Sequence, residues 1–443
     1  MSSYLPKKSL KNLFSWLFLA FMIIALSQFL ATIILVKFCA PELVGRFALA
    51  NAITIPIFAF TSLDLGSLQI TDAKNQYSFE DYLNVRLVTS GIALFLSIII
   101  PIFAGYPWDT LIIIWLTAAL RALESVSGIM YGLIQKSEQM KTLAYLGSSK
   151  SIFSILLLGV VLYLTGSLSL ALILLILSRI FYLFFYELPY SLATVDSSYS
   201  SKSHGLSPLS IQSSQIAWSK LFTTKWHHQK LLNLAKLALP MGIVTLLVSF
   251  NANVPRYLLE KYTGEASLGI FASIASLMAI GDTVLNPLGT SATPRMSQYC
   301  AEGNFKAFWR ILSKLVAIAL VMGIIIITAC LLIGQPFLEI IYRKEYGQYI
   351  NLLTLLMLAG SIEDISSFLG QAIIATRSFR LKMVVSATVT TISALIGLWL
   401  IPKQGLYGAA IALLIGSLID MGLNIAAIIY IIVKQRKNKL LST

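Results

Sequence analysis

Polar residues at helical spacing interrupt the hydrophobic runs of this chain and offer its most specific chemistry. Thr245, Ser249, Asn253 and Arg256 follow i, i+4, i+8 and i+11 spacing, which places them on one face of a helix. A charged side chain in bilayer hydrocarbon costs about 2.5–3.5 kcal/mol, so such a face turns toward a bundle interior or a water-filled cavity. The pattern predicts a hydrated, partly cationic cavity.

Similar polar stripes occur in several other hydrophobic runs, and two interpretations of them stay open. Ser, Thr and Asn on helix faces also hydrogen-bond neighbouring helices, and Arg121 and Glu124, one turn apart, also suit a neutral structural pair. Because the stripes occur in both halves of the chain, we favour the cavity. They comprise Asn51, Thr54, Thr61 and Asp64; Thr117, Arg121, Glu124, Ser125 and Gly128; Asp282, Asn286 and Thr290; Gly360, Glu363, Asp364, Ser367 and Gln371; and Asp420 and Asn424.

Arginine has a specific use in such a cavity. Its planar guanidinium binds phosphate oxygens through paired hydrogen bonds and stays charged at any relevant pH. We therefore assign Arg256, Arg121 and Arg179 to phosphate binding, with Arg46 and Arg86 as weaker candidates because they lie near the ends of hydrophobic runs. Two further expectations concern Arg256: its side chain alternatively extends to the membrane interface, and the proline before it kinks or loosens the helix.

The composition defines the class of protein that carries these stripes. Hydrophobic residues make up 57% of the chain and charged residues 12%, against about 25% charged residues in soluble domains. Apolar runs of about 20 residues recur, long enough to cross a bilayer as helices. The sequence therefore predicts a polytopic membrane protein. Its net charge of +14 is interpreted as topogenic, with no nucleic-acid partner.

Cysteine and histidine usage excludes several other chemistries. Cys39, Cys300 and Cys330 are far apart, and the three histidines lie between the hydrophobic runs. This spacing predicts neither a disulfide framework nor a metal site, and no cofactor is expected. The first hydrophobic run, 14–36, is longer than a signal-peptide core and is interpreted as a retained helix.

About twelve membrane-spanning helices follow from the length criterion. Lysine and arginine are concentrated before the first span, after the last span and in alternate links. Since the basic side of a membrane protein faces the cytoplasm, we expect both termini and the long link 189–232 on the cytoplasmic side. The predicted spans are 14–36, 43–70, 83–104, 110–134, 143–165, 168–188, 233–257, 266–293, 311–333, 350–375, 381–401 and 406–433.

An internal repeat relates the two halves of the chain. KFCAPELVGRFALA at 37–50 corresponds to KYTGEASLGIFASI at 261–274, and both copies follow the first span of their half. We therefore predict an all-α integral membrane protein of two six-helix bundles, at 1–188 and 233–443, joined by a cytoplasmic linker at 189–232. Bundles repeated in this way enclose a central site and alternate access by rocking.

The chain resembles the oligosaccharide and polysaccharide flippases, the O-antigen or Wzx-type group, of the multidrug/oligosaccharidyl-lipid/polysaccharide exporter superfamily. The resemblance covers essentially the whole chain. It is carried by PELVGRFALANAI, SLDLG, NVPRYLLEKYTGEASLGIFASIASL, PRMSQYCAEGNFKAFWRIL, LEIIYRKEYGQY and PKQGLYGAAIALLIGSLID. Each motif is loose, and their order along the chain gives the match its specificity.

The resemblance implies a MATE-like fold and transport, without catalysis, of undecaprenyl-pyrophosphate-linked oligosaccharide for surface polysaccharide. Membrane lipids and a polysaccharide polymerase complex are the further candidate partners. In such a transporter Asn253 and Asn286 join the arginines as substrate-binding candidates. The candidates for binding a coupling proton or sodium ion are Asp64, Glu124, Asp282, Glu363, Asp364 and Asp420.

Two other functions remain as alternatives. A cation-coupled multidrug exporter of the same fold would favour an acidic, aromatic cavity, whereas this chain places arginines there. A membrane polymerase or ligase would be expected to carry catalytic groups on a substantial outer loop, and the predicted outer links are short.

Overall fold

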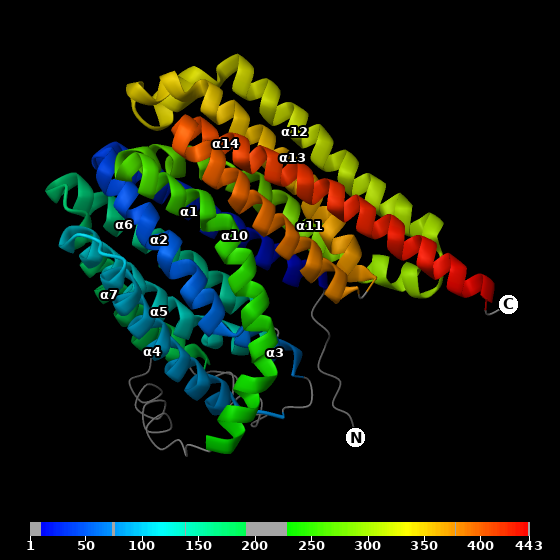
Figure 1. The fold of residues 1–443 in the computed structure, drawn as a ribbon. Coiled ribbons are helices and arrows are strands. Elements are labelled where there is room, and N and C mark those ends of the chain that lie inside the picture. The colour runs from blue at the N-terminus through cyan, green and yellow to red at the C-terminus, as the bar shows by residue number, and fades with distance from the viewer. Residues whose placement is uncertain (1–9, 73–75, 138, 192–227, 377, 442–443) are drawn as a thin grey trace. The chain divides into compact units, whose positions relative to one another are not determined.

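The computed structural model describes residues 10–72, 76–137, 139–191, 228–376 and 378–441, and every regular element in these residues is helical (Figure 1). The predicted linker 189–232 falls mostly outside them. The elements are α1 (Leu10–Phe38), α2 (Pro41–Ser62), α3 (Leu65–Thr71), α4 (Phe79–Phe103), α5 (Trp108–Lys136), α6 (Met140–Thr165), α7 (Leu168–Tyr182), the π-helix η1 (Leu183–Glu187), α10 (His228–Ala275), α11 (Ala279–Ala301), α12 (Phe305–Ile341), the 3-10 helix η2 (Lys344–Tyr349), α13 (Ile350–Ala375) and α14 (Phe379–Leu441).

Nine helices in the described part of the chain are long and apolar enough to cross a membrane. Two of them are too long for one crossing: α10 has 48 residues and α14 has 63, whereas about 20 residues span the hydrocarbon. Each is broken at a glycine with positive φ, Gly264 at 84° and Gly405 at 54°, a conformation that glycine adopts without strain. Dividing both helices at these glycines, with the short second part of α10 continuing through α11 as one crossing, and adding α1 gives the predicted twelve.

Pro255 lies inside α10 with helical dihedral angles, and a kink or loosening of the helix there stays a prediction. Within α10 the non-helical dihedral angles occur at Gly264. Proline fixes φ near −65°, which is compatible with a helix, and transmembrane helices tolerate the lost hydrogen bond when neighbouring groups satisfy the backbone. Glycine, by contrast, leaves the helical region altogether.

The chain forms two compact units, which are described separately below. The first contains Met1–Ile34 and Ala50–Ser249, and the second contains Leu35–Leu49 and Phe250–Thr443. The grouping differs from the predicted bundles because the junction of α1 and α2 belongs to the second unit and the first part of α10 belongs to the first. The predicted boundaries at 188 and 233 stay a prediction.

The two copies of the sequence repeat contact each other within the second unit. A Cβ atom on Gly45 would collide with the backbone oxygen of Glu265, and one on Gly269 would collide with the backbone oxygen of Pro41. In the alignment of the repeat, Gly45 corresponds to Gly269 and Pro41 to Glu265. The contact is therefore reciprocal, as expected when two equivalent segments meet around a local two-fold axis.

Charge-assisted hydrogen bonds hold the α1–α2 junction in this unit. Arg46 Nε lies 2.7 Å from Glu265 Oε2, and Arg343 Nη2 donates to the backbone oxygens of Lys37 and Cys39 at 3.1 and 2.6 Å. Bonds from a guanidinium are stronger than those between neutral groups. They explain why residues 35–49 pack with the second unit.

We expect Gly45→Leu to destabilise the protein by about 1–3 kcal/mol, because the new side chain overlaps rigid backbone. The control is Gly91→Leu on α4, where a Cβ meets no atom within 4 Å. Thermal unfolding of both variants in detergent, followed by tryptophan fluorescence, checks the prediction. Equal unfolding temperatures for the two variants would contradict the close contact at Gly45.

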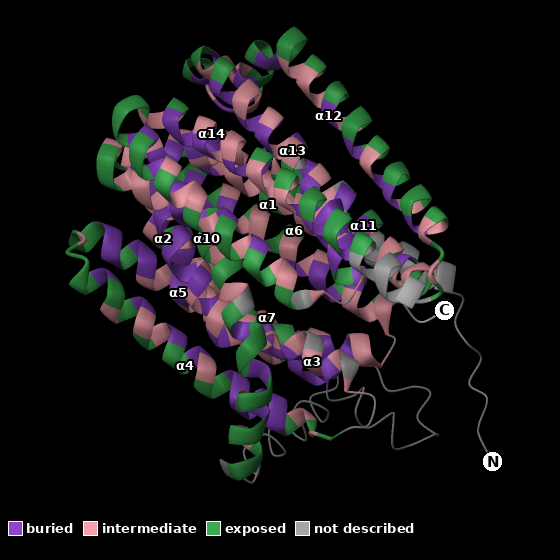
Figure 2. Ribbon diagram, turned by 45° about the vertical axis from the view of Figure 1, so that its right-hand side comes forward, coloured by how far each residue is buried: buried purple, intermediate pink, exposed green. Residues whose placement is uncertain are grey.

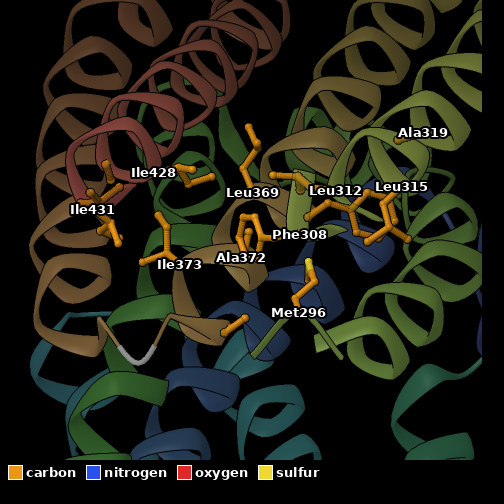
Figure 3. Close-up of a cluster of buried hydrophobic side chains, with 14 of the residues drawn as sticks. Met296, Phe308, Leu312, Leu315, Ala319, Leu369, Ala372, Ile373, Ile428 and Ile431 are labelled. Carbon is orange, nitrogen blue, oxygen red and sulfur yellow. The ribbon is translucent and has the colours of Figure 1, made fainter. Parts of the chain in front are cut away.

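A hydrophobic core joins the four long helices of the second unit. Met296 from α11, Phe308 from α12, Leu369 from α13 and Ile428 from α14 are buried in one cluster (Figure 3). Side chains of this size stabilise by about 1.5–3 kcal/mol each when they are fully buried. Burial of these side chains stabilises the packing of α11, α12, α13 and α14 against one another.

The outer faces of the long helices are apolar. On α12, Ile324, Leu331 and Leu332 are 62%, 68% and 77% exposed, and Figure 2 shows exposed residues recurring along α4 and α12. Extended apolar surface of this kind marks an interaction or membrane-facing region. The chain is a multi-pass membrane protein, and we expect these faces to contact lipid.

Candidate anion-binding site

A pocket of about 260 Å³ lies within the first unit, where α5 packs against α4 and α2 contributes its C-terminal turns. It combines two arginines with one carboxylate and small polar groups. Such a lining favours an anionic ligand with hydrogen-bonding oxygens. The lining residues are Phe58, Ser62, Arg86, Arg121, Glu124, Ser125 and Gly128.

Arg86 is the most unusual of these residues. Its side chain is buried, and its Nε and Nη1 atoms have no hydrogen-bond partner among the described residues. The start of α4 is fixed by a capping box in which Ser78 and Asp81 exchange hydrogen bonds, so the position of Arg86 two turns later is well defined. A buried donor without a partner costs about 1–3 kcal/mol, and more when it is charged. A bound anion would remove that cost.

Arg121 is held in the pocket by groups on α2. Its Nη2 atom lies 2.5 Å from Asn51 Oδ1, and its Nε atom lies 3.1 Å from Thr54 Oγ1. Thr54 in turn donates to the backbone oxygen of Ala50. These bonds use only part of the donor set of a guanidinium. Arg121 therefore has a fixed orientation and retains donors for a ligand.

Glu124 pairs with Arg179, at 3.5 Å between Oε1 and Nη2. Glu124 also attracts Arg121 electrostatically, and both residues line the pocket, so the alternative of an Arg121–Glu124 structural pair stays a prediction. Arg179, predicted to bind phosphate, lies on α7 and is not among the residues that line the pocket. Its charge offsets Glu124, so the pocket keeps a net positive character.

We expect Arg179→Gln to weaken anion binding about fivefold, because a partly exposed ion pair is worth about 1 kcal/mol and Glu124 would lose its neutralising partner. Adding Glu124→Gln should restore the affinity. Binding of undecaprenyl pyrophosphate to the purified variants checks this prediction. A double variant that binds no better than Arg179→Gln would contradict the charge argument.

A strained break between α2 and α3 directly follows Ser62, which lines the pocket. After Ser62, Leu63 and Asp64 adopt positive φ angles of 51° and 46°, which cost non-glycine residues of order 1–3 kcal/mol each. Asp64, a predicted ion-coupling residue, lies in this break and attracts Arg86 electrostatically. Unwound backbone at membrane depth is typical of transporter sites, where it lines a cavity or is buried in protein.

Other predicted site residues lie in the second unit and have local partners. Arg256 Nη1 donates to Asn253 Oδ1 at 2.7 Å, one helical turn away. Asp420 accepts hydrogen bonds from Ser366 at 2.5 Å and from Asn424 at 3.0 Å, and lies 3.9 Å from Lys382 Nζ. Their roles in substrate binding and ion coupling stay predictions.

The remaining acidic candidates differ in their surroundings. Glu363 is exposed, whereas Asp364 is buried beside Gly281, where a Cβ would lie 2.9 Å from Asp364 Oδ2. The side chains of Asp282 and Asn286 are outside the described part of the chain. Ion coupling at these carboxylates, and a sugar contact at Asn286, stay predictions.

The sequence reasoning missed a buried polar cluster in the first unit. Glu187 accepts hydrogen bonds from Lys150 Nζ at 2.5 Å, from Tyr131 at 2.7 Å and from Ser127. Lys150 counts in the sequence only as a topogenic charge. The sequence did offer one signal for this cluster, because Glu187 is an acidic residue at the end of an apolar run. The π-helix that carries Glu187 has no sequence signature.

A matching cluster in the second unit is built from the equivalent predicted spans. Ser127 with Lys150 corresponds to Ser366 with Lys382, and Glu187 corresponds to Asp420. Ser127 and Ser366 each lie nine residues before the last residue of their helices, which end at 136 and 375. The two halves of the chain are therefore similar beyond the repeated segments 37–50 and 261–274.

The fold is that of transporters of the MATE type. Over 95% of this chain and 96% of the other, it superposes on the inward-facing conformation of a multidrug resistance MATE family transporter of the MOP superfamily, with a TM-score of 0.70 and 15% identity. The lipid II flippase MurJ in its inward closed conformation gives a TM-score of 0.68 at 14% identity, over 95% and 90% of the chains. The predicted all-α, MATE-like membrane fold is confirmed.

The chain belongs to the polysaccharide biosynthesis protein family, whose model matches residues 9–300. The capsular polysaccharide biosynthesis protein CapF of Staphylococcus aureus is 28% identical to it over 416 residues, which are 92% of this chain and 96% of the relative. The predicted resemblance to membrane proteins of polysaccharide biosynthesis is thereby confirmed.

Proposed function

We propose that the protein translocates undecaprenyl-pyrophosphate-linked oligosaccharide across the bacterial plasma membrane by alternating access, with both termini in the cytoplasm. The observation that carries this proposal is the buried Arg86 guanidinium, whose open donors lie in a pocket with Arg121. Family membership and the resemblance to CapF, named for capsular polysaccharide biosynthesis, support a saccharide substrate.

The pyrophosphate is the part of this substrate that most needs a protein site. Moving an anion through hydrocarbon carries a large desolvation cost, which paired guanidinium groups offset with charge-assisted hydrogen bonds. In our mechanism Arg86 and Arg121 hold the phosphates while the prenyl chain stays in the bilayer. The same two positive charges would repel a cationic drug, which is the substrate that a multidrug exporter of this fold would carry.

A binding and depletion experiment tests the function. Purified protein in nanodiscs should bind undecaprenyl pyrophosphate and should not bind undecaprenol, which lacks the anion. Cells depleted of the protein should lose surface polysaccharide and accumulate lipid-linked saccharide on the cytoplasmic side. Intact surface polysaccharide together with new drug sensitivity would instead identify a drug exporter.

A further inference from the structure

Gln69 on α3 has a buried side-chain amide. Its side chain is 1% exposed, and neither Nε2 nor Oε1 has a partner in the part of the chain that the structure describes. Burying a primary amide without partners is unfavourable. An apolar side chain of similar size would suit this position better if its role were only to fill space.

The position of Gln69 is close to the anion pocket. A Cβ on Gly132 of α5 would lie 2.7 Å from Gln69 Oε1, and Gly132 is one helical turn from Gly128, which lines the pocket. Residues four apart share a helix face. The amide therefore lies against the same face of α5 as the pocket, about one turn further along.

The segment that carries Gln69 is also strained. It leaves the pocket wall at Ser62 and passes through Leu63 and Asp64, which both have positive φ. Strained backbone of this kind is concentrated at active sites, ligand clamps and switch regions. A rotation of α3 about this break would relieve the strain and bring the amide to the pocket.

We propose that Gln69 binds hydroxyl groups of the saccharide attached to the pyrophosphate, an inference that rests on the proposed function. A primary amide offers donors and an acceptor together, which matches neighbouring hydroxyls of a sugar ring. It carries no charge and so does not compete with the phosphates for Arg86 and Arg121. Gln69 thus distinguishes a lipid with saccharide from the bare prenyl pyrophosphate.

The test compares two ligands on wild-type protein, Gln69→Leu and Gln69→Met in nanodiscs. The ligands are undecaprenyl pyrophosphate and the lipid-linked saccharide isolated from cells that lack the protein. We expect wild type to bind the saccharide lipid about tenfold more tightly, the gain from about two neutral hydrogen bonds. Both variants should lose this tenfold preference, bind undecaprenyl pyrophosphate like wild type and unfold at a higher temperature.

Gln335→Leu is the matched control, because Gln335 is an exposed glutamine on α12 that bonds Glu339. It should keep the preference for the saccharide lipid. The proposal is overturned if wild type shows no preference, or if both Gln69 variants retain it. If wild type binds neither lipid, the proposed function fails as well, which separates the two results.

Discussion

Arg86→Leu should reduce the affinity for undecaprenyl pyrophosphate by about a hundredfold or more. Hydrogen bonds to a charged group contribute about 1.5–3 kcal/mol each, and two nitrogen atoms of Arg86, Nε and Nη1, have no hydrogen-bond partner among the residues that the structure describes. The same substitution removes the desolvation cost of a buried guanidinium, which the attraction of Asp64 only partly offsets, so the variant should be as stable as wild type or more stable. Loss of binding without loss of stability is the expected signature of a ligand-binding arginine.

Binding of undecaprenyl pyrophosphate in nanodiscs and thermal unfolding of the same samples provide the two measurements. Arg310→Leu is the control, since Arg310 is exposed near the start of α12. In cells, Arg86→Leu should fail to restore surface polysaccharide while Arg310→Leu restores it. An Arg86→Leu protein with wild-type affinity would remove the central support for the anion site.

Glu187→Leu should destabilise the protein by about 3–5 kcal/mol, the cost of leaving one partner of a buried ion pair uncompensated. Glu187 is fully buried and lies 2.5 Å from Lys150 Nζ, and Lys150 itself is nearly buried. The double variant Lys150→Met with Glu187→Leu should recover at least half of the loss. Replacing both charges by apolar groups of similar size is often close to neutral.

Thermal and chemical unfolding in detergent measure these differences. Lys306→Met serves as the control, because Lys306 is exposed in the first turn of α12. A single variant as stable as wild type would show that the pair contributes little. A double variant as unstable as the single one would show that the hydroxyls of Tyr131 and Ser127, and not the charge of Lys150, determine the loss.

The sequence predicts the class of this protein because hydrophobic length is a local property. A run of about 20 apolar residues has to cross a bilayer whatever its neighbours are, so the spans and the all-α membrane fold can be read directly. The preference of glycine for positive φ at the breaks in α10 and α14 is also a local property. Gly264 and Gly405 fall within the links predicted at 258–265 and 402–405.

The helical stripes also reveal which residues share a face, but not what that face meets. Arg256 and Asn253 share a stripe, and their hydrogen bond lies within one turn. Arg121, by contrast, bonds Asn51, which is seventy positions away. Periodicity fixes the face of a helix, whereas helix rotation and packing decide its partner.

Only the tertiary structure therefore shows which residues form the candidate anion site. By sequence, Arg86 is a weak candidate near a span end, and its importance comes from the partners that it lacks in the described chain. Glu124 pairs with Arg179 on another helix, and Glu187 with Lys150. The sequence by itself determined a repeated, membrane-spanning helical fold with cations inside its helices, because length, hydrophobicity and periodicity act locally. Which cations are neutralised and which stay available depends on contacts between distant segments.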